Sequence, residues 1–478
     1  MKTVIQLLLA FVILTSFIKP DRSTADGFKI DENYKVQGTF SGNTQGEDSF
    51  HFIIAKNKKE KNYDILPFQF KNEEIVKMEP ITFKEQPNVL SFHNNGDQLS
   101  VITSYKDGKS RKFQVVDVNL KDYTVKKSEA LDGENYKTTV REKDQNFLVF
   151  SDKESLKIVA VKNASDVKDI TIEATAANKE FLKMLSKNNL DAISSQDFVE
   201  NGSINDFRIY SDQGTITITQ EDTKEGTTNV AQIDTSDSSN TELKVTNFKS
   251  NDSGEGKLKK STSYVSDNKL FQMNLKKDAA TLDVHNLDDK SNKQLNLLSG
   301  DVVSAASSKT AANSFLKNAT KGKNQPTVTV NEAQDGALKL RIDYVNKKLY
   351  NYNYNWWWHH HWMMQNQMWM MQQQQQQMML QNSLPRFGPD VSDAYPIYTV
   401  KEKEDSFFEI GLNTNGSIIP ASDVTTIHKN IDKKSYIDDI DNNKKLKHSS
   451  TVFTKTTFRY ISYNKKTKSF LINSKSLK

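Results

Sequence analysis

The chain has 478 residues, with 65 Lys or Arg, 60 Asp or Glu and a formal net charge of +5. A nucleic-acid-binding protein usually concentrates its basic residues in one stripe, and so small an imbalance over this length argues against a nucleic-acid partner. Hydrophobic residues make up 36% of the chain and aromatic residues 10%, which excludes wholesale disorder and predicts a folded protein with a large core.

The N-terminal residues have the pattern of a secretory signal peptide. Lys2 precedes an apolar run over residues 5–14, and the small residues Ser23 to Ala25 follow. This order predicts a signal peptide over residues 1–25 that is removed near Ala25, and an uncleaved membrane anchor is the alternative. No other stretch is apolar over the ~18 residues of a helical span, so we expect no transmembrane segment after signal removal.

The chain contains no cysteine. An exported protein without cysteine has no disulfides, and it also lacks the cysteine that carries the lipid of a bacterial lipoprotein. Disulfides are common among eukaryotic secreted proteins. We therefore expect a bacterial protein of the cell envelope that is periplasmic, associated peripherally with the outer membrane through partners, or extracellular.

Residues 88–127 predict four consecutive antiparallel strands. Alternating apolar and polar residues are interrupted by Asn95-Gly96 and by Asp107-Gly108. Such pairs tolerate the positive φ angles of tight hairpins, so each marks a turn between two strands. Looser versions of this meander recur every roughly 40–50 residues, which is the length of a four-stranded β-propeller blade.

In architecture the chain resembles a β-propeller of about six or seven blades, and two β-sandwiches in tandem are the alternative. It lacks the Trp-Asp pair of WD40 repeats and the glycine pairs of kelch repeats, so the resemblance implies a mainly β fold and no functional residues. We expect a propeller-like β region over residues 26–354 and a C-terminal β region over 391–478 that completes it.

Three segments interrupt the predicted strands. Apolar residues at helical spacing predict a short helix over residues 176–186, and a further helical turn is expected around residues 311–316. Residues 236–256 are rich in Ser, Asn, Asp and Gly and are interpreted as a loop.

A fourth departure from the β pattern is an insertion over about residues 355–390. It holds all five tryptophans and most of the methionines, and no charged residue occurs from Asn351 to Pro385. Met and Gln favour helices, so we expect a helical insertion that ends before Pro385. An exposed helix of this length normally carries charges, so its faces are expected to contact protein, membrane or another chain.

Three hypotheses account for this composition. The helix packs against its own propeller, with methionines filling irregular gaps. It forms an interface with an envelope protein partner, for which the candidate residues are Trp358, Trp362, Trp369, Met368 and Met371. Or it binds copper, since thioether and imidazole groups suit that metal, with the candidate ligands His359, His360, His361, Met363 and Met364. The glutamine run over residues 372–377 is also typical of disordered or self-associating segments.

Motifs of the common enzyme classes are absent from the sequence. There is no nucleophile elbow, zinc-protease helix, phosphate-binding loop or dinucleotide fingerprint. His51, His93 and His285 are scattered, without a recognisable nucleophile beside them. The acidic residues 438–442 lack the glycine and glutamate of a calcium-binding EF-hand loop. We therefore favour a non-enzymatic binding or scaffold protein, with copper capture by the insertion as the alternative.

Overall fold

The computed structural model describes a large part of the chain: residues 27–44, 46–142, 144–193, 206–236, 242–250, 256–321, 325–333, 335–344, 350–352, 397–399, 407–426, 446–454 and 456–477. The predicted signal peptide, the helical insertion over 355–390 and the acidic residues 438–442 lie outside these ranges. The structure therefore leaves the interpretations of those segments as predictions.

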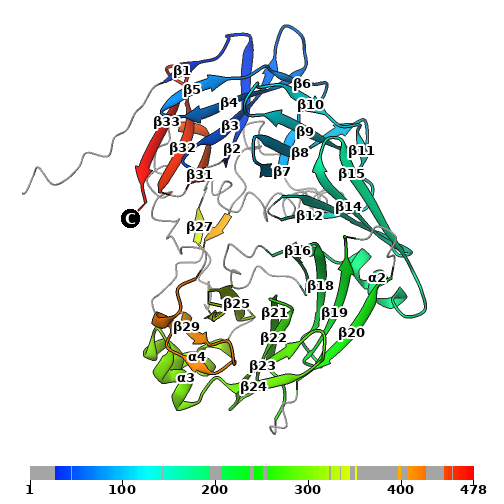
Figure 1. Cartoon of the computed structure of the whole chain (residues 1–478), viewed down its shortest axis with the longest axis vertical. Coiled ribbons are helices and arrows are strands. Elements are labelled where there is room, and N and C mark those ends of the chain that lie inside the picture. The colour runs from blue at the N-terminus through cyan, green and yellow to red at the C-terminus, as the bar shows by residue number, and fades with distance from the viewer. Residues whose placement is uncertain are drawn as a thin grey trace, which may run out of the picture.

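Within the described ranges, seven sheets of four or five strands follow one another around a ring (Figure 1). We number them as blades in chain order. Blade 1 contains β2 (Tyr34–Asn43), β3 (Ser49–Asn57), β4 (Tyr63–Lys71), β5 (Glu74–Lys77) and β6 (Ile81–Phe83). Blade 2 contains β7 (Asn88–Asn95), β8 (Gln98–Asp107), β9 (Ser110–Asn119), β10 (Val125–Lys127) and β11 (Leu131–Asp132). Blade 3 contains β12 (Tyr136–Arg141), β13 (Asn146–Ser151), β14 (Ser155–Asn163) and β15 (Asp166–Glu173).

The remaining blades complete the ring. Blade 4 contains β16 (Leu190–Ala192), β17 (Phe207–Asp212), β18 (Thr215–Asp222), β19 (Thr227–Asp234) and β20 (Lys244–Lys249). Blade 5 contains β21 (Lys260–Ser266), β22 (Lys269–Leu275), β23 (Ala280–Asn286) and β24 (Asn292–Asn296). Blade 6 contains β25 (Thr327–Glu332), β26 (Leu338–Asp343), β29 (Phe407–Leu412) and β30 (Ile418–Ile419). Blade 7 contains β31 (Leu446–Phe453), β32 (Thr457–Asn464), β33 (Ser469–Ser476) and β1 (Phe28–Lys29).

The fold is therefore mainly β, with the propeller-like array of antiparallel meanders that the hairpin spacing predicts. Each blade is built from strands close together in sequence, apart from blade 7 and the long connection inside blade 6. The tandem-sandwich alternative is wrong, because two packed pairs of sheets would need fewer, larger sheets than these seven. The pairing of β16 with β17 departs from the pattern, since it is parallel.

Blade 7 joins the two ends of the described chain. The short strand β1 pairs with β33, so that Phe28 lies opposite Phe470. The Phe28 ring also packs edge-on against Phe68 of blade 1, with the ring centroids 4.9 Å apart. The first strand thus links blade 7 to blade 1.

Apolar clusters fill most junctions between neighbouring blades. They join blades 7 and 1, 1 and 2, 2 and 3, 3 and 4, and 5 and 6. Strands such as β3 and β13 are buried along nearly their whole length, because a blade is covered on both faces by its neighbours. This explains why their sequences are continuous apolar runs in places.

The local predictions for turns and helices can be compared directly with the structure. Gly96 and Gly108 have φ angles of +65° and +60° in the turns that separate β7, β8 and β9. The first predicted helix is confirmed as α2 (Lys179–Lys187), which buries three apolar residues: Phe181, Leu182 and Leu185.

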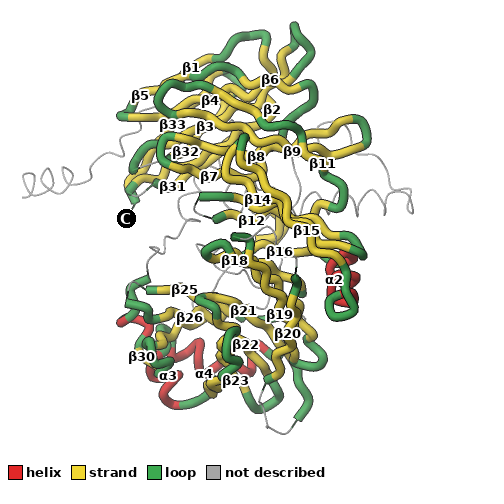
Figure 2. The backbone as a smooth tube through the Cα atoms, turned by 45° about the vertical axis from the view of Figure 1, so that its right-hand side comes forward, coloured by secondary structure: helices red, strands yellow, loops and turns green. Residues whose placement is uncertain are grey.

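The two other predictions need correction. The single turn expected near residues 311–316 is too short, because the chain forms α3 (Gly300–Ala305) and α4 (Lys309–Ala319), each capped by a serine side chain. The loop interpretation of residues 236–256 is wrong for β20, whose Phe248 is buried against blade 5. Figure 2 shows how these few helices lie outside the sheets. Within the described ranges, the remaining short elements are the 3₁₀ turn η3 (Ala421–Asp423) and the paired strands β27 (Tyr350–Tyr352) and β28 (Ile397–Thr399).

Membrane insertion by a helix finds no support in this part of the chain. Of the helices in the described ranges, none is long and apolar enough to cross a bilayer.

Candidate functional site

The site residues predicted from composition all lie outside the described ranges. These are the interface candidates Trp358, Trp362, Trp369, Met368 and Met371 and the copper candidates His359, His360, His361, Met363 and Met364. The structure therefore does not test whether they come together. It does describe two short strands, one before and one after the insertion that contains them.

The insertion is attached to blade 6 through a short paired stem. Strands β27 and β28 are antiparallel, with Tyr352 opposite Ile397. On the ring side of the stem, β26 and β29 are direct neighbours, with Asp343 opposite Phe407. In blade 2 the corresponding strands β8 and β9 are joined by the tight turn at Gly108. The insertion thus occupies the place of a hairpin turn.

A second candidate site lies where blades 4 and 5 meet. The residues of β22 alternate, with Phe271 and Met273 on one face and Gln272 and Asn274 on the other. The apolar face belongs to the cluster shared with blade 6. The polar face is turned to blade 4, where Gln272 donates to the carbonyl oxygen of Gly226 at 3.0 Å. The junction between blades 4 and 5 therefore combines this polar contact with a small apolar cluster of Val230, Phe248, Leu270 and Leu287.

A buried ion pair forms the inner part of this polar junction. Arg208 Nη1 lies 2.8 Å from Glu221 Oε1, and both side chains are almost completely buried. Arg208 also donates to Thr262 Oγ1 and to the carbonyl oxygen of Ser263, and the Ser263 N–H donates to Glu221. Burial raises the pKa of the Glu221 carboxyl, since desolvation outweighs the attraction of Arg208. The pair connects blade 4 to the first strand of blade 5.

Several buried polar atoms at this junction have no hydrogen-bond partner among the described residues. They are both amide atoms of Asn274, the hydroxyl of Thr281 and Oδ1 of Asn292. An unsatisfied buried polar atom costs about 1–3 kcal/mol. These atoms are therefore a local energetic cost within the polar part of the junction.

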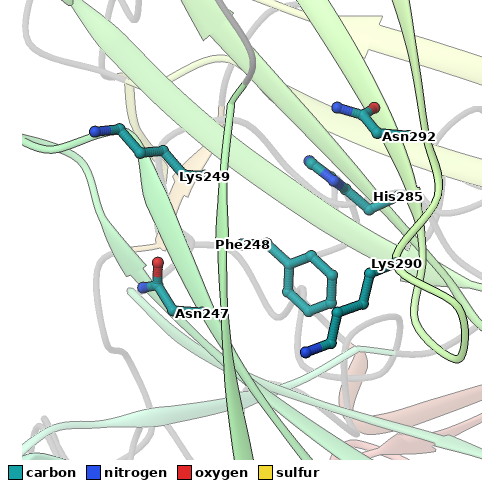
Figure 3. Close-up of a pocket in the computed structure, with 6 residues that line it drawn as sticks. All are labelled: Asn247, Phe248, Lys249, His285, Lys290 and Asn292. Carbon is teal, nitrogen blue, oxygen red and sulfur yellow. The ribbon is translucent and has the colours of Figure 1, made fainter.

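A pocket of about 200 Å³ opens at the outer end of the junction. The lining consists of Asn247, Phe248, Lys249, His285, Lys290 and Asn292. As Figure 3 shows, Phe248 of β20 points toward the residues of blade 5, whereas Asn247 and Lys249 of the same strand point away from them. The Phe248 and His285 rings pack together with centroids 5.3 Å apart. Burial lowers the pKa of His285, so this imidazole is neutral near pH 7.

The sequence alone does not predict this pocket, since His285 is one of several scattered histidines and β20 lies within the segment that is interpreted as a loop. The alternation of Gln272 and Asn274 with apolar neighbours on β22 was the available signal. This alternation indicates a strand with one buried polar face. It does not indicate which blade covers that face, because that depends on how the blades are arranged in the ring.

Two other described histidines, His51 and His93, lie in structural positions. Ser41 Oγ is 2.7 Å from His51 Nδ1, and Ser49 Oγ is 2.9 Å from Nε2. His51 is fully buried, so this serine and histidine arrangement has no access for a substrate. His93 bonds to the Lys162 carbonyl oxygen and to Asn146. Among the described residues, no group of His, Cys, Asp and Glu is arranged to hold a metal ion.

His51 makes the stability of the protein depend on pH. Burial, together with the charge of Arg459, lowers its pKa from 6.5 to about 3. Between these values the unfolded chain binds a proton that the folded chain does not, so stability falls as the pH decreases, by up to about 1.4 kcal/mol per pH unit. Replacing His51 with Gln is expected to remove this one-proton dependence, measured by urea unfolding at pH values from 7 to 4.5. Equal slopes for both proteins would contradict the assignment.

Comparisons with known proteins give no family. No protein-family model matches the chain, and no curated protein matches it. Among solved structures, the β-propeller domain of Cps50 (Swd1) from Myceliophteria thermophila is 9% identical, with 94% of this chain and 99% of that chain covered and a TM-score of 0.29. Oligopeptidase B from Leishmania major is 8% identical, with coverage of 93% and 49% and a TM-score of 0.34.

A third similar structure is the WD40 domain of SCAP from fission yeast, which is 10% identical, with coverage of 56% and 65% and a TM-score of 0.29. The chain spans 49% to 65% of the length of several structures that it matches. At these TM-scores the comparisons carry no argument about function, and the fold is defined by the strand pairing itself.

Proposed function

We propose that this protein is an exported binding or scaffold protein of the bacterial cell envelope, and that it presents the Trp-, Met- and Gln-rich insertion as a protein-interaction element. The observation that supports this is the stem at Tyr352 and Ile397, which attaches the insertion at the place of a hairpin turn. Insertions on a rigid β framework are common sites of binding. The N-terminal signal pattern supports export, and the absence of catalytic motifs favours binding over catalysis.

The test replaces residues 353–396 with a two-residue Asn-Gly turn. Because Tyr352 and Ile397 are already cross-strand partners, this turn joins them without moving the stem. The variant is expected to retain the β circular dichroism and the unfolding midpoint of the full protein within about 3 °C. It should lose envelope partners that the full protein retains after cross-linking in cells.

All five tryptophans lie in the insertion, so their fluorescence reports on it alone. A second variant replaces Trp358, Trp362 and Trp369 with Ala and keeps the rest of the insertion. It tests whether these three side chains, rather than the mere presence of the insertion, bind the partners. Both variants should lose the same cross-linked partners. Recovery of an unchanged set of partners by both folded variants overturns the proposal, and a Cu(I) affinity that the Asn-Gly variant loses would favour copper capture instead.

A further inference from the structure

Two neighbouring turns on blades 7 and 1 are rich in lysine. The first joins β32 to β33 over residues 465–468, and the second joins β3 to β4 over residues 58–61. Glu60 is the single acidic residue in the two turns, and neither turn contains arginine. Together they carry six exposed lysines: Lys58, Lys59, Lys61, Lys465, Lys466 and Lys468.

Both turns lie at the same end of their blades, which stand side by side in the ring (Figure 1). The strands β2 and β31 run next to each other in the same direction. Thr39 Oγ1 donates to the carbonyl oxygen of His448 at 2.7 Å. Two residues further along each strand, Ser41 Oγ lies 2.6 Å from Ser450 Oγ. Because β3 and β32 each run back antiparallel to these strands, the turns that follow them lie where β2 and β31 begin.

The first described strand connects the two turns. Lys29 of β1 lies opposite Ser469, which directly follows Lys468. Four residues after Lys29, the carbonyl oxygen of Asn33 accepts a hydrogen bond from the Lys58 N–H at 2.9 Å. Since four residues span at most about 14 Å, the two turns belong to one surface, which we call the lysine face (residues 58–61 and 465–468).

Neighbouring segments do not balance the positive charge of the lysine face. Residues 29–35, which connect the turns, contain two lysines and two acidic residues. The Asp64 carboxylate near the start of β4 is buried, and it accepts hydrogen bonds from Tyr34 and Thr82. The segments 1–26 and 427–445 precede β1 and β31 and lie outside the described ranges. By sequence, each contains one more basic than acidic residue.

The lysine excess is a property of this part of the ring. The corresponding turns of blades 2 to 5 join β8 to β9, β13 to β14, β18 to β19 and β22 to β23. Together these four turns contain six lysines and six acidic residues, at positions 106–109, 152–154, 222–226 and 276–279. The positive charge therefore does not follow from the blade pattern itself.

The composition of the lysine face favours a partner whose negative charges are spread over a surface. A lysine ammonium group is a point charge on a flexible stem, without the planar fork by which arginine recognises a single carboxylate or phosphate. Interfaces between proteins are enriched in arginine and aromatic residues and depleted in lysine. The headgroups of an anionic lipid bilayer need no such fixed geometry, and each lysine close to them strengthens binding by about a factor of five.

We propose that the lysine face binds the surface of a lipid bilayer that contains anionic phospholipids. The six ammonium groups provide the attraction, and the two turns place them at one end of adjacent blades, where a flat surface can meet them together. This surface is formed by described residues of blades 7 and 1. It is separate from the insertion and does not depend on the function proposed for it.

The experiment measures flotation of the full chain with lipid vesicles. One set of vesicles contains equal parts of phosphatidylglycerol and phosphatidylcholine, and the other contains phosphatidylcholine alone. Binding to the anionic vesicles is expected to be tighter by roughly tenfold or more at low salt. This preference should disappear at about 1 M salt, where the Debye length is roughly 3 Å. Replacing Lys59, Lys466 and Lys468 with Gln should weaken binding to the anionic vesicles by roughly tenfold or more.

The matched control replaces Lys153, Lys224 and Lys277 with Gln. These exposed lysines lie in the corresponding turns of blades 3, 4 and 5, so the change in net charge is the same. The control should bind the anionic vesicles as the wild type does. The variant with an Asn-Gly turn in place of residues 353–396 should also keep the preference for anionic vesicles, which separates this surface from the insertion. Unchanged thermal unfolding verifies that the variants fold.

Three results would overturn the proposal. The first is equal binding of the anionic vesicles by the two triple lysine variants. The second is equal binding of the full chain to the anionic and the neutral vesicles. The third is tighter binding of soluble polyglutamate than of the anionic vesicles, with the same dependence on Lys59, Lys466 and Lys468, which would assign the lysine face to an acidic polypeptide.

Discussion

Replacing Glu221 with Ala is expected to lower the free energy of unfolding by about 3–5 kcal/mol, because it leaves the buried Arg208 guanidinium without its carboxylate. Arg208 is only 2% exposed, so water cannot take the place of the lost partner. The loss should appear in urea unfolding followed by circular dichroism at pH 7. It should be accompanied by loosening of the junction between blades 4 and 5, visible as faster amide exchange in β18 and β21.

Two further variants distinguish the buried charge from the loss of packing. The double replacement Arg208→Met with Glu221→Leu removes both charges and should destabilise the protein less than Glu221→Ala alone. As a matched control, Glu180→Ala breaks the exposed pair between Glu180 and Lys183 in α2, which should cost no more than about 0.5 kcal/mol. A Glu221→Ala effect as small as that of the control would show that the pair does not stabilise the junction.

The second large effect is expected in the aromatic cluster between blades 1 and 2. Phe50 is fully buried, and its ring centroid lies 4.9 Å from that of Phe92 and 5.1 Å from that of Phe52. Phe50→Ala should therefore destabilise the protein by about 3–5 kcal/mol through the lost contacts and the cavity left behind. The free energy of unfolding in urea measures the effect.

Gly42 shows why the space beside this ring is restricted. A Cβ atom at Gly42 would lie 2.3 Å from the Phe50 ring, so Gly42→Ala should cost about 1–3 kcal/mol. In the Phe50→Ala background the same substitution should cost less, because the nearest ring is absent and the Phe92 ring, 2.8 Å from the added Cβ, can move into the space that Phe50 leaves. Gly38→Ala in the same strand is the control, since a Cβ there would meet no atom within 4 Å. Additive effects of the two substitutions in the double variant would contradict this packing.

Much of each blade is predictable from sequence because the strands that pair are neighbours along the chain. Asn95-Gly96 and Asp107-Gly108 allow the backbone to reverse, and the alternating residues on either side can pair only in one register if the apolar faces are to be buried. The length of the meander then gives the size of a blade. Helix α2 was predictable for a similar local reason, since Phe181, Leu182 and Leu185 share one face.

Other features could not be read from local pattern. Residues 244–249 lie within a segment rich in Ser, Asn, Asp and Gly, but they contain the strand-favouring Val245, Thr246 and Phe248. They form β20 because they pair with β19 and blade 5 covers Phe248. Helix α4 is longer than the predicted turn because its buried face extends to Ala319, which packs against blades 5 and 6. Helix α3 has no counterpart among the predicted helices, and it buries Val302 in the same cluster. The unusual composition of residues 356–371 is visible in the sequence. The residues that line the pocket have no unusual composition or spacing in the sequence, because they come from separate strands and turns.

The sequence by itself determined the β class, the hairpins and the repeated meander, because turn preference and alternating burial act between residues close together in the chain. Only the tertiary structure decided which blades are neighbours, that Phe28 pairs opposite Phe470, and that Phe248 meets His285. These contacts join residues far apart in sequence, and their energies depend on the shape of the closed ring. The polar face of β22 shows the difference. Alternation in the sequence indicates that face, but only the ring places Gln272 against Gly226 and Thr228 of blade 4.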